Sequence, residues 1–229
     1  MSGNVGSKSN VRSDALLSGA EQSLLRLLCR HIPAWVTPNA MTLLGVVGAA
    51  IAFVGLSGAH KVAGSPWLAV VGIAINWFGD SMDGSLARFR QSERPKFGFF
   101  VDHLSDALSV ALICVGISLS PFANLLSGLI LLVAYYLMFI ISLITCQVSG
   151  TFRICYSRLG PTEMRLLLVL CILGMITMPV STFAWGDITL TIYDIVFVTM
   201  ASLMVMAGTA YTIKIGRGLC ISDPPVRHT

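Results

Sequence analysis

The stretch that decides the fold runs from Asp80 to Asp106 and reads DSMDGSLARFRQSERPKFGFFVDHLSD. It sets four aspartates, two glycines, an alanine and an arginine at helical spacings: Asp80, Asp83, Gly84, Ala87, Arg88, Gly98, Asp102 and Asp106. The rest of the chain is mainly apolar. Four carboxylates are costly inside a membrane unless positive charge lies between them, and a pair of divalent metal ions supplies that charge most simply.

The composition predicts an integral membrane protein. The 229 residues are 55% hydrophobic and 11% charged, with a mean hydropathy of +0.80, whereas soluble domains carry about 25% charged residues. Apolar runs of about 18 or more residues indicate membrane-spanning helices. Six spans are predicted, at about 40–58, 66–89, 97–118, 122–147, 164–181 and 189–213. The expected fold class is therefore an all-α integral membrane protein with six transmembrane helices and no separate soluble domain.

The basic residues predict the orientation of these spans, because short cytoplasmic loops collect Lys and Arg. With both termini in the cytoplasm, every Lys and Arg except Lys61 falls on the cytoplasmic side. The net charge of +4 follows from the same bias, so no nucleic-acid partner is needed to explain it. Small size and the lack of sorting signals favour a bacterial inner membrane, with an internal eukaryotic membrane as the alternative.

The segment before the first span is expected to lie at the membrane surface. Residues 1–13 are polar and predicted to be disordered, and residues 14–35 form an amphipathic juxtamembrane helix. A plain helical lead-in to the first span is the open alternative for the latter. Residues 36–215 then form the six-helix domain, and residues 216–229 a cytoplasmic tail.

Helical geometry gathers the motif residues on two facing surfaces. At about 100° per residue, the five motif residues of the second span share one face, and the three of the third span form one stripe. Pro95 and the charged stretch 90–96 break the helix between them. The two spans are therefore expected to be antiparallel neighbours, with the four carboxylates at one level, recessed from the cytoplasmic surface.

These residue types suit a metal-assisted phosphate site. Ligation by oxygen alone favours Mg²⁺, Mn²⁺ or Ca²⁺ over zinc. Arg88 offers a forked cation for a phosphate oxygen, and the missing side chains at Gly84 and Gly98 leave room for a ligand. The alternative left open by the residues is a proton or cation relay in a transporter.

At these residues the chain resembles the CDP-alcohol phosphotransferases, also called CDP-alcohol phosphatidyltransferases. Their signature is D-x2-D-G-x2-A-R, eight or nine residues, then G-x3-D-x3-D, and every fixed position is met. The resemblance implies a phospholipid-synthesising transferase that moves a substituted phosphate from a CDP-linked donor to an alcohol hydroxyl and releases CMP. It also implies two Mg²⁺ or Mn²⁺ ions, membrane lipids as partners, and a homodimer.

The resemblance further assigns roles to individual residues. The metal ligands would be Asp80, Asp83, Asp102 and Asp106. Asp106 would also be the general base. The CDP moiety would be accommodated by Gly84, Ala87, Arg88 and Gly98, and a weaker similarity at the start of the first span adds Asn39 and Thr42.

Three further residues are candidates for catalysis or acceptor binding. His103 is a rival base, because its ordinary pKa suits proton transfer near neutral pH, although the plainer interpretation is a polar residue near the cavity mouth bonded to a carbonyl. Arg158 and Arg165 flank a Gly-Pro break between the fourth and fifth spans and would bind an anionic acceptor. The positive-inside bias is the alternative explanation of such arginines, and it is favoured for their neighbour Arg153.

The donor stays open at this point. CDP-diacylglycerol would give its phosphatidyl group to a polar alcohol, whereas CDP-choline or CDP-ethanolamine would give its head group to a lipid hydroxyl. The compact six-span chain favours the first, while Asp102-His103 and the run Gly160-Pro161-Thr162-Glu163 resemble the second. An intramembrane prenyltransferase, which also uses aspartates and Mg²⁺, is less favoured because more spans would be expected.

Overall fold

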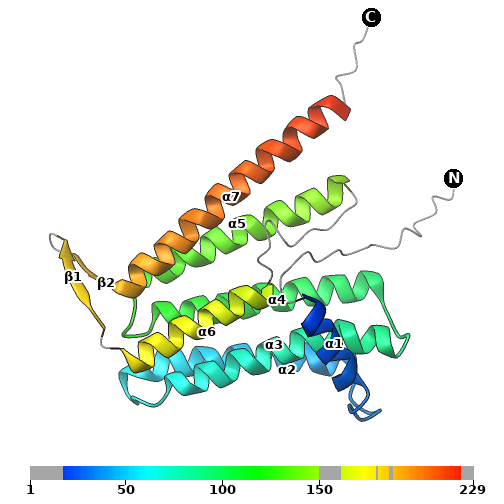
Figure 1. The fold of residues 1–229 in the computed structure, drawn as a ribbon, viewed down its shortest axis with the longest axis horizontal. Helices are drawn as coiled ribbons and strands as arrows, with labels where there is room; N and C mark the ends of the chain where they lie inside the picture. The colour runs from blue at the N-terminus through cyan, green and yellow to red at the C-terminus, as the bar shows by residue number, and fades with distance from the viewer. Residues whose placement is uncertain (1–17, 150–160, 179, 186–187, 223–229) are drawn as a thin grey trace, which may run out of the picture.

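The computed structural model describes residues 18–149, 161–178, 180–185 and 188–222. Its elements, in chain order, are α1 (Ser18–Cys29), α2 (Pro38–Ser57), η1 (Gly58–His60), α3 (Pro66–Phe89), α4 (Pro95–Ser118), α5 (Leu125–Ser149), α6 (Pro161–Thr177), β1 (Thr182–Trp185), β2 (Ile188–Thr191) and α7 (Ile192–Ser222). In Figure 1, α2, α3, α4 and α6 run side by side, and α5 and α7 rise away from them at an angle.

Prolines and one capping threonine set where the helices begin. Pro38, Pro66 and Pro95 lie at the first positions of α2, α3 and α4, where the missing backbone N–H leaves no hydrogen bond unmade. Thr37 caps α2, since its hydroxyl oxygen accepts a hydrogen bond of 3.2 Å from the backbone N–H of Ala40. The predicted break between the second and third spans is confirmed, because α3 ends at Phe89 and α4 begins at Pro95.

Glycines allow α2 and α3 to pack with their backbones in contact. A Cβ atom on Gly72 would lie 2.6 Å from the carbonyl oxygen of Gly48, and one on Gly79 would lie 2.5 Å from that of Met41. In a membrane no hydrophobic effect drives helices together, so small residues that permit close contact stabilise such pairs. Because Asp80 follows Gly79 directly, this contact fixes the position of the first motif carboxylate.

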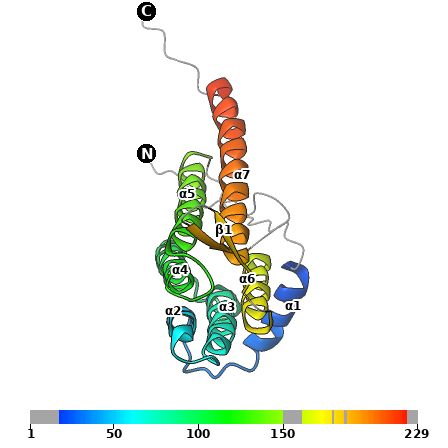
Figure 2. The ribbon, with the colours of Figure 1, turned by 90° about the vertical axis from the view of Figure 1, so that its left-hand side faces the viewer.

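The arrangement around α2 refines the predicted pairing of the second and third spans. α2 packs extensively on both α3 and α4, whereas α3 and α4 touch each other over only a short stretch. α6 and α1 both pack on α3, and α5 packs on α4 and α7. Figure 2 shows α1 beside α3 and α6. The two motif helices are therefore held mainly through α2, which closes one side of the space between them.

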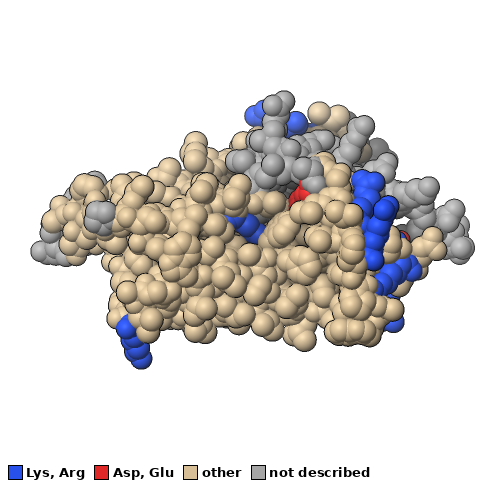
Figure 3. Space-filling view, turned by 60° about the horizontal axis from the view of Figure 1, so that its bottom comes forward, with Lys and Arg blue, Asp and Glu red and all other residues tan. Residues whose placement is uncertain are grey.

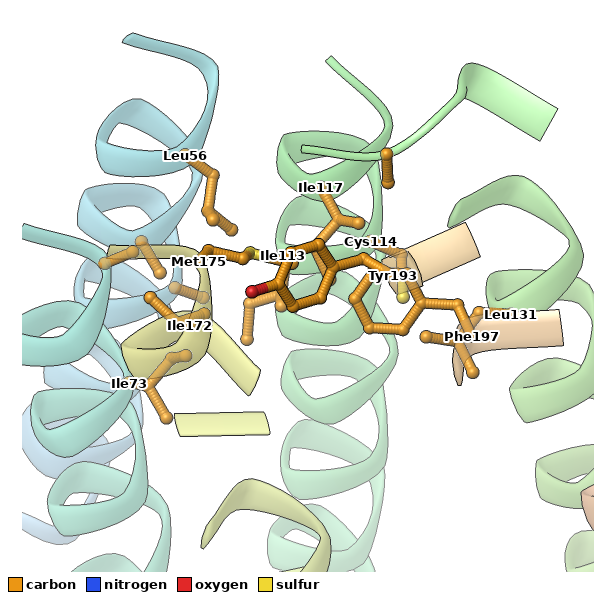
Figure 4. Packing of buried hydrophobic residues seen from close by; sticks show 14 of the residues in the cluster. Leu56, Ile73, Ile113, Cys114, Ile117, Leu131, Ile172, Met175, Tyr193 and Phe197 are labelled. Atoms are coloured by element: carbon orange, nitrogen blue, oxygen red, sulfur yellow. The ribbon is translucent and has the colours of Figure 1, made fainter. Parts of the chain in front are cut away.

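An apolar core joins the bundle to α5 and α7. Figure 4 shows Phe197 and Tyr193 of α7 reaching in beside Ile113 and Cys114 of α4, with Ile172 of α6 in the same cluster. Phe197 and Ile172 are fully buried. The C-terminal half of α6 is thus anchored by apolar packing, while its N-terminal half contributes polar side chains to the site described below.

Asp194, to which the sequence suggested no role, ties the start of α7 to the start of α5. It is 1% exposed. Its carboxylate accepts hydrogen bonds from the backbone and side-chain amides of Asn124, from the hydroxyl of Ser127, and from the backbone N–H and hydroxyl of Thr191. A buried carboxylate with this many donors is structural, because its desolvation is fully compensated.

Four helices in the described part of the chain are long and apolar enough to cross a membrane: α2 with η1, α4, α5 and α7. α3 is as long as α4, with 24 residues each, but carries the charged motif, and the apolar part of α6 covers only Met164–Thr177. Figure 3 shows a largely uncharged face, with most charged side chains near one end and one basic side chain at the other. The protein is an integral membrane protein, and the number of six spans stays a prediction.

The structure is mainly helical, as expected, and adds one short hairpin that was not predicted. β1 and β2 are antiparallel, with Thr182 paired to Thr191 and Trp185 to Ile188. The predicted fifth span, 164–181, ran past the end of α6 at Thr177, and the predicted sixth span, 189–213, began within β2, whereas α7 begins at Ile192. Alternating β-branched or aromatic residues on both sides of a Gly-Asp pair are typical of a hairpin, but residues 182–188 lay between the two predicted spans.

Two predicted boundaries also differ from the structure. The juxtamembrane helix was predicted over 14–35, but α1 ends at Cys29, because Pro33 and the linker that follows cannot continue it. The C-terminal tail was predicted from residue 216, but α7 remains helical to Ser222. The predicted disordered segment 1–13 lies outside the described residues.

Candidate active site

Three of the four motif carboxylates converge between α3 and α4. Oxygen atoms of Asp80, Asp102 and Asp106 all lie within 4.8 Å of one another. Asp102 and Asp106 are one helical turn apart on α4, and Asp80 faces them from α3. Three carboxylate oxygens at this separation match the ligands that Mg²⁺ and Mn²⁺ prefer, so the residues fit a divalent metal ion.

Arg165 of α6 reaches into the same carboxylates. One of its Nη atoms lies 2.7 Å from Asp80 Oδ2 and 3.6 Å from Asp106 Oδ1, and the side chain is 17% exposed. The sequence predicted an acceptor-binding role for Arg165, and the structure brings it directly to the carboxylate cluster. A bound cation would be coordinated by the same carboxylate oxygens of Asp80 and Asp106 that Arg165 contacts. The other predicted acceptor residue, Arg158, lies outside the described residues.

Asp83 stands apart from this cluster. Its carboxylate accepts a hydrogen bond of 2.6 Å from the hydroxyl of Thr42 on α2 and another from the backbone N–H of Gly84. Its charge still acts on Asp80 and Asp102 across the space between the helices. Thr42, which is expected to accommodate the nucleotide, orients this fourth carboxylate in the structure.

The other residues expected at the nucleotide lie toward the surface. A Cβ atom on Gly84 would lie 3.2 Å from Nη1 of Arg88. The other terminal nitrogen of this guanidinium, Nη2, donates to the hydroxyl of Ser85 at 3.3 Å. Arg88 is exposed, and a Cβ atom on Gly98 would meet no atom within 4 Å. Arg88 and Gly98 are therefore accessible to a ligand, whereas the guanidinium of Arg88 fills the space beside Gly84.

Ala87 and Asn39 are the other two residues that were expected to accommodate the nucleotide. Ala87 is half-buried one turn after Asp83 on α3. Asn39 is exposed in the first turn of α2, three residues before Thr42. Residues three or four apart share a helix face, so both can face the same ligand as their neighbours.

His103 is held beside Asp102. Its Nδ1 lies 2.8 Å from the carbonyl oxygen of Phe99 and 3.4 Å from Asp102 Oδ2, and its ring stacks on that of Phe99 with centroids 4.0 Å apart. This geometry fits a tautomer with the proton on Nδ1, donated to the carbonyl. It matches the description of a polar residue bonded to a carbonyl, which the sequence offered as an alternative to catalysis.

Asn76 was not predicted from the sequence. It is 2% exposed, and its amide group donates to the carbonyl of Gly45 at 3.0 Å and to the hydroxyl of Ser109 at 3.1 Å. It thereby links α2, α3 and α4 close to Asp80 and Asp106. Its position one turn before Asp80, within an apolar run, was the signal that could have revealed it.

Two other polar contacts near the site were also missed. Glu21 of α1 accepts hydrogen bonds from Trp77 and Ser81 of α3 and from Thr162 of α6. Arg90 donates to carbonyl oxygens in the linker between α1 and α2, among them that of Pro33 at 2.8 Å. Since the partners are distant in the sequence, spacing could not have indicated either contact.

The comparisons with known proteins agree with this site. A family model described as CDP-alcohol phosphatidyltransferase matches residues 35–213. Over 92 residues the chain is 36% identical to an archaetidylinositol phosphate synthase of Methanothermobacter thermautotrophicus, a match that covers 40% of this chain and 44% of the relative. The family match includes the whole motif from Asp80 to Asp106. The protein is therefore an enzyme of the CDP-alcohol phosphatidyltransferase family, whose members act in the membrane on a CDP-alcohol donor and an alcohol acceptor.

Proposed function

We propose that this enzyme transfers a phosphatidyl group from CDP-diacylglycerol to the hydroxyl of a small phosphorylated alcohol and releases CMP. The observation that carries the proposal is the convergence of Asp80, Asp102 and Asp106 with the guanidinium of Arg165 beside them. The name of the relative supports the choice of acceptor, because archaetidylinositol phosphate combines a lipid with a phosphorylated alcohol.

The carboxylates would hold two divalent ions, Mg²⁺ or Mn²⁺. Asp80, Asp102 and Asp106 have oxygens close enough to share one ion, and Asp83, whose charge acts on two of them, is the further ligand available for a second. When bound, such ions supply positive charge that offsets the charge of the diphosphate and of the leaving CMP. The remaining chemistry falls to side chains of this chain.

Asp106 is the proposed general base. It lies beside Asp80 and Asp102, and its carboxylate can take the proton of an acceptor hydroxyl that comes within hydrogen-bond reach. The acceptor oxygen then bonds to the phosphorus of the phosphatidyl group as the bond from that phosphorus to the CMP oxygen breaks. The products are a phosphodiester and CMP, and no covalent enzyme intermediate is required.

Arg165 is the proposed acceptor-binding residue. Its guanidinium can bind the phosphate of the acceptor in a forked geometry, and its position 3.6 Å from Asp106 would bring the acceptor hydroxyl to the base. Arg158, close to it in the sequence, is the second candidate for this role. An acceptor without a phosphate would lose this interaction.

The nucleotide of the donor would occupy the side of the site at which Arg88 and Gly98 are accessible. Arg88 would bind a phosphate oxygen of the CDP moiety, with Gly84, Ala87 and Gly98 beside it and Asn39 and Thr42 bordering it from α2. The acyl chains of the donor would remain in the surrounding lipid.

We propose six spans with both termini in the cytoplasm, an active site that faces the cytoplasm, and the bacterial inner membrane as the location. The support is the sorting of basic residues, all of which except Lys61 fall on one side. We further propose that the domain extends over residues 36–215 and that the enzyme works as a homodimer, as the family resemblance implies.

The proposed function is tested by measuring CMP release from the purified enzyme in lipid nanodiscs with Mg²⁺. CDP-diacylglycerol is paired with glycerol phosphate or inositol phosphate, with the unphosphorylated alcohols as matched controls, and CDP-choline is paired with diacylglycerol. We expect release only with CDP-diacylglycerol and a phosphorylated acceptor, and its loss with EDTA or in Asp102→Asn. Release from CDP-choline, or release that is indifferent to EDTA, would contradict the proposal.

A further inference from the structure

Glu21 connects three helices immediately beside the carboxylate cluster. Its carboxylate accepts hydrogen bonds of 3.0 Å from the indole N–H of Trp77, from the hydroxyl of Ser81 and from the hydroxyl of Thr162. The other oxygen of Glu21 also lies 3.0 Å from the Thr162 hydroxyl. α1, α3 and α6 therefore meet at one carboxylate, as their arrangement in Figure 2 allows.

The energetics of this contact favour a fixed geometry. A half-buried carboxylate is costly unless hydrogen-bond donors replace the water that it loses, and Glu21 has donors from two other helices. Thr162 lies in the first turn of α6, where the helix dipole also favours a negative charge. Moving α6 away from α3 would break these interactions together.

The Glu21 contact and the Asp80–Arg165 ion pair involve neighbouring residues of the same two helices, α3 and α6. On α3, Ser81 is next to Asp80, and on α6, Thr162 is one turn before Arg165. Ser81 is linked to Thr162 through Glu21, and Asp80 is linked to Arg165 directly at 2.7 Å. Because residues three apart share a helix face, both links hold the same side of α6 against the same part of α3.

The N-terminal half of α6 depends on these polar links. α6 has 17 residues, and its buried apolar residues Ile172 and Met175 lie in its C-terminal half. Near its start, the described contacts to other helices include those of Thr162 and Arg165. Without Glu21, the first turn of α6 loses the polar link that connects Thr162 through α1 to Trp77 and Ser81 of α3.

We propose that Glu21 is a positioning residue, which fixes the first turn of α6 against α3 and so holds Arg165 beside Asp80 and Asp106. The consequence for catalysis rests on the proposed function, in which Arg165 binds the phosphate of the acceptor. Loss of Glu21 then weakens acceptor binding, while the donor side around Arg88 and Gly98 is unchanged. The helix before the first span is thus part of the acceptor site.

The position of Arg165 can be measured without any activity. Phenylglyoxal modifies exposed arginines, and peptide mass spectrometry of the enzyme in nanodiscs reports the rate at each one, with the exposed Arg217 as internal reference. We expect Glu21→Ala and Thr162→Val to raise the modification rate of Arg165 at least threefold relative to Arg217. Glu21→Gln keeps an acceptor oxygen and should fall between. Gln22→Ala, a change at an exposed neighbour on α1, should match the wild type.

Steady-state kinetics of the same variants supply the second measurement. We expect Glu21→Ala and Thr162→Val to raise the acceptor KM at least fivefold while the donor KM stays within twofold. An Arg165 modification rate that is unchanged in both variants, or equally raised in Gln22→Ala, would overturn the positioning role. An equal rise in both KM values would do the same. Absence of CMP release in the wild type would refute the proposed function, whereas the modification rates would still decide the role of Glu21.

Discussion

Substitution of Gly72 by alanine tests whether the α2–α3 contact sets the geometry of the site. The added Cβ atom would lie 2.6 Å from the carbonyl oxygen of Gly48 and closer still to the backbone nitrogen of Ala52, whereas ordinary contacts begin at 3.4 Å, so the helices must separate by at least about 0.8 Å. Overpacking of this kind costs about 1–3 kcal/mol. Asp80 lies eight residues further along α3, about 12 Å along its axis, so a shift of the helix also displaces this carboxylate.

The expected result is a loss of both stability and turnover. A displacement near 1 Å at a catalytic group can reduce the rate about 100-fold, and a partial shift at Asp80 predicts a reduction of at least about 10-fold. Thermal unfolding in detergent and CMP release well below the unfolding temperature measure the two effects. The matched control is Gly216→Ala on α7, where a Cβ atom would meet nothing within 4 Å. Both changes gain the same helix propensity, so equal stability and turnover in the two variants would refute the packing argument.

Three further substitutions separate the parts of the site. Asp194→Ala removes the acceptor of five hydrogen bonds and should lower the free energy of unfolding by about 3 kcal/mol or more, while the Mn²⁺ affinity is retained. An unchanged thermal unfolding temperature would count against its structural role. Arg88→Ala should raise the donor KM about 10-fold with stability unchanged, since a charged hydrogen bond contributes about 1.5–3 kcal/mol, and an unaltered donor KM would contradict the phosphate contact. Arg165→Gln should raise the acceptor KM at least about 10-fold. It should also tighten Mn²⁺ binding, because the guanidinium competes for oxygens of Asp80 and Asp106. Weaker Mn²⁺ binding, measured by titration calorimetry, would argue against that competition.

Local periodicity carried the successful part of the sequence analysis. The helix break at Pro95 and the shared stripe of Asp102 and Asp106 follow from residues within one or two turns of each other, and their convergence with Asp80 was predicted from the antiparallel arrangement that this break implies. The family followed from the same motif. These helix breaks and shared faces can be predicted because, in a regular helix, the spacing of two residues determines whether they lie on the same face.

Long-range contacts account for what could not be predicted. Thr42 and Asp83 are 41 residues apart, and Glu21 and Thr162 are 141 residues apart, so no spacing rule could have paired them. The insertion of Arg165 depends on how α6 packs on α3, which in turn depends on backbone contacts between other helices. The hairpin of β1 and β2 was missed because β2 was taken as the start of the sixth span, while β1 lay between the two predicted spans.

The central claim is that Asp80, Asp102 and Asp106 form a divalent cation site at which the donor binds. Anomalous diffraction from crystals grown with Mn²⁺ tests it most directly. We expect a manganese peak about 2.0–2.3 Å from oxygens of all three carboxylates, with Arg165 released from Asp80. An absence of manganese at these residues, with Arg165 still paired to Asp80 at saturating Mn²⁺, would contradict it.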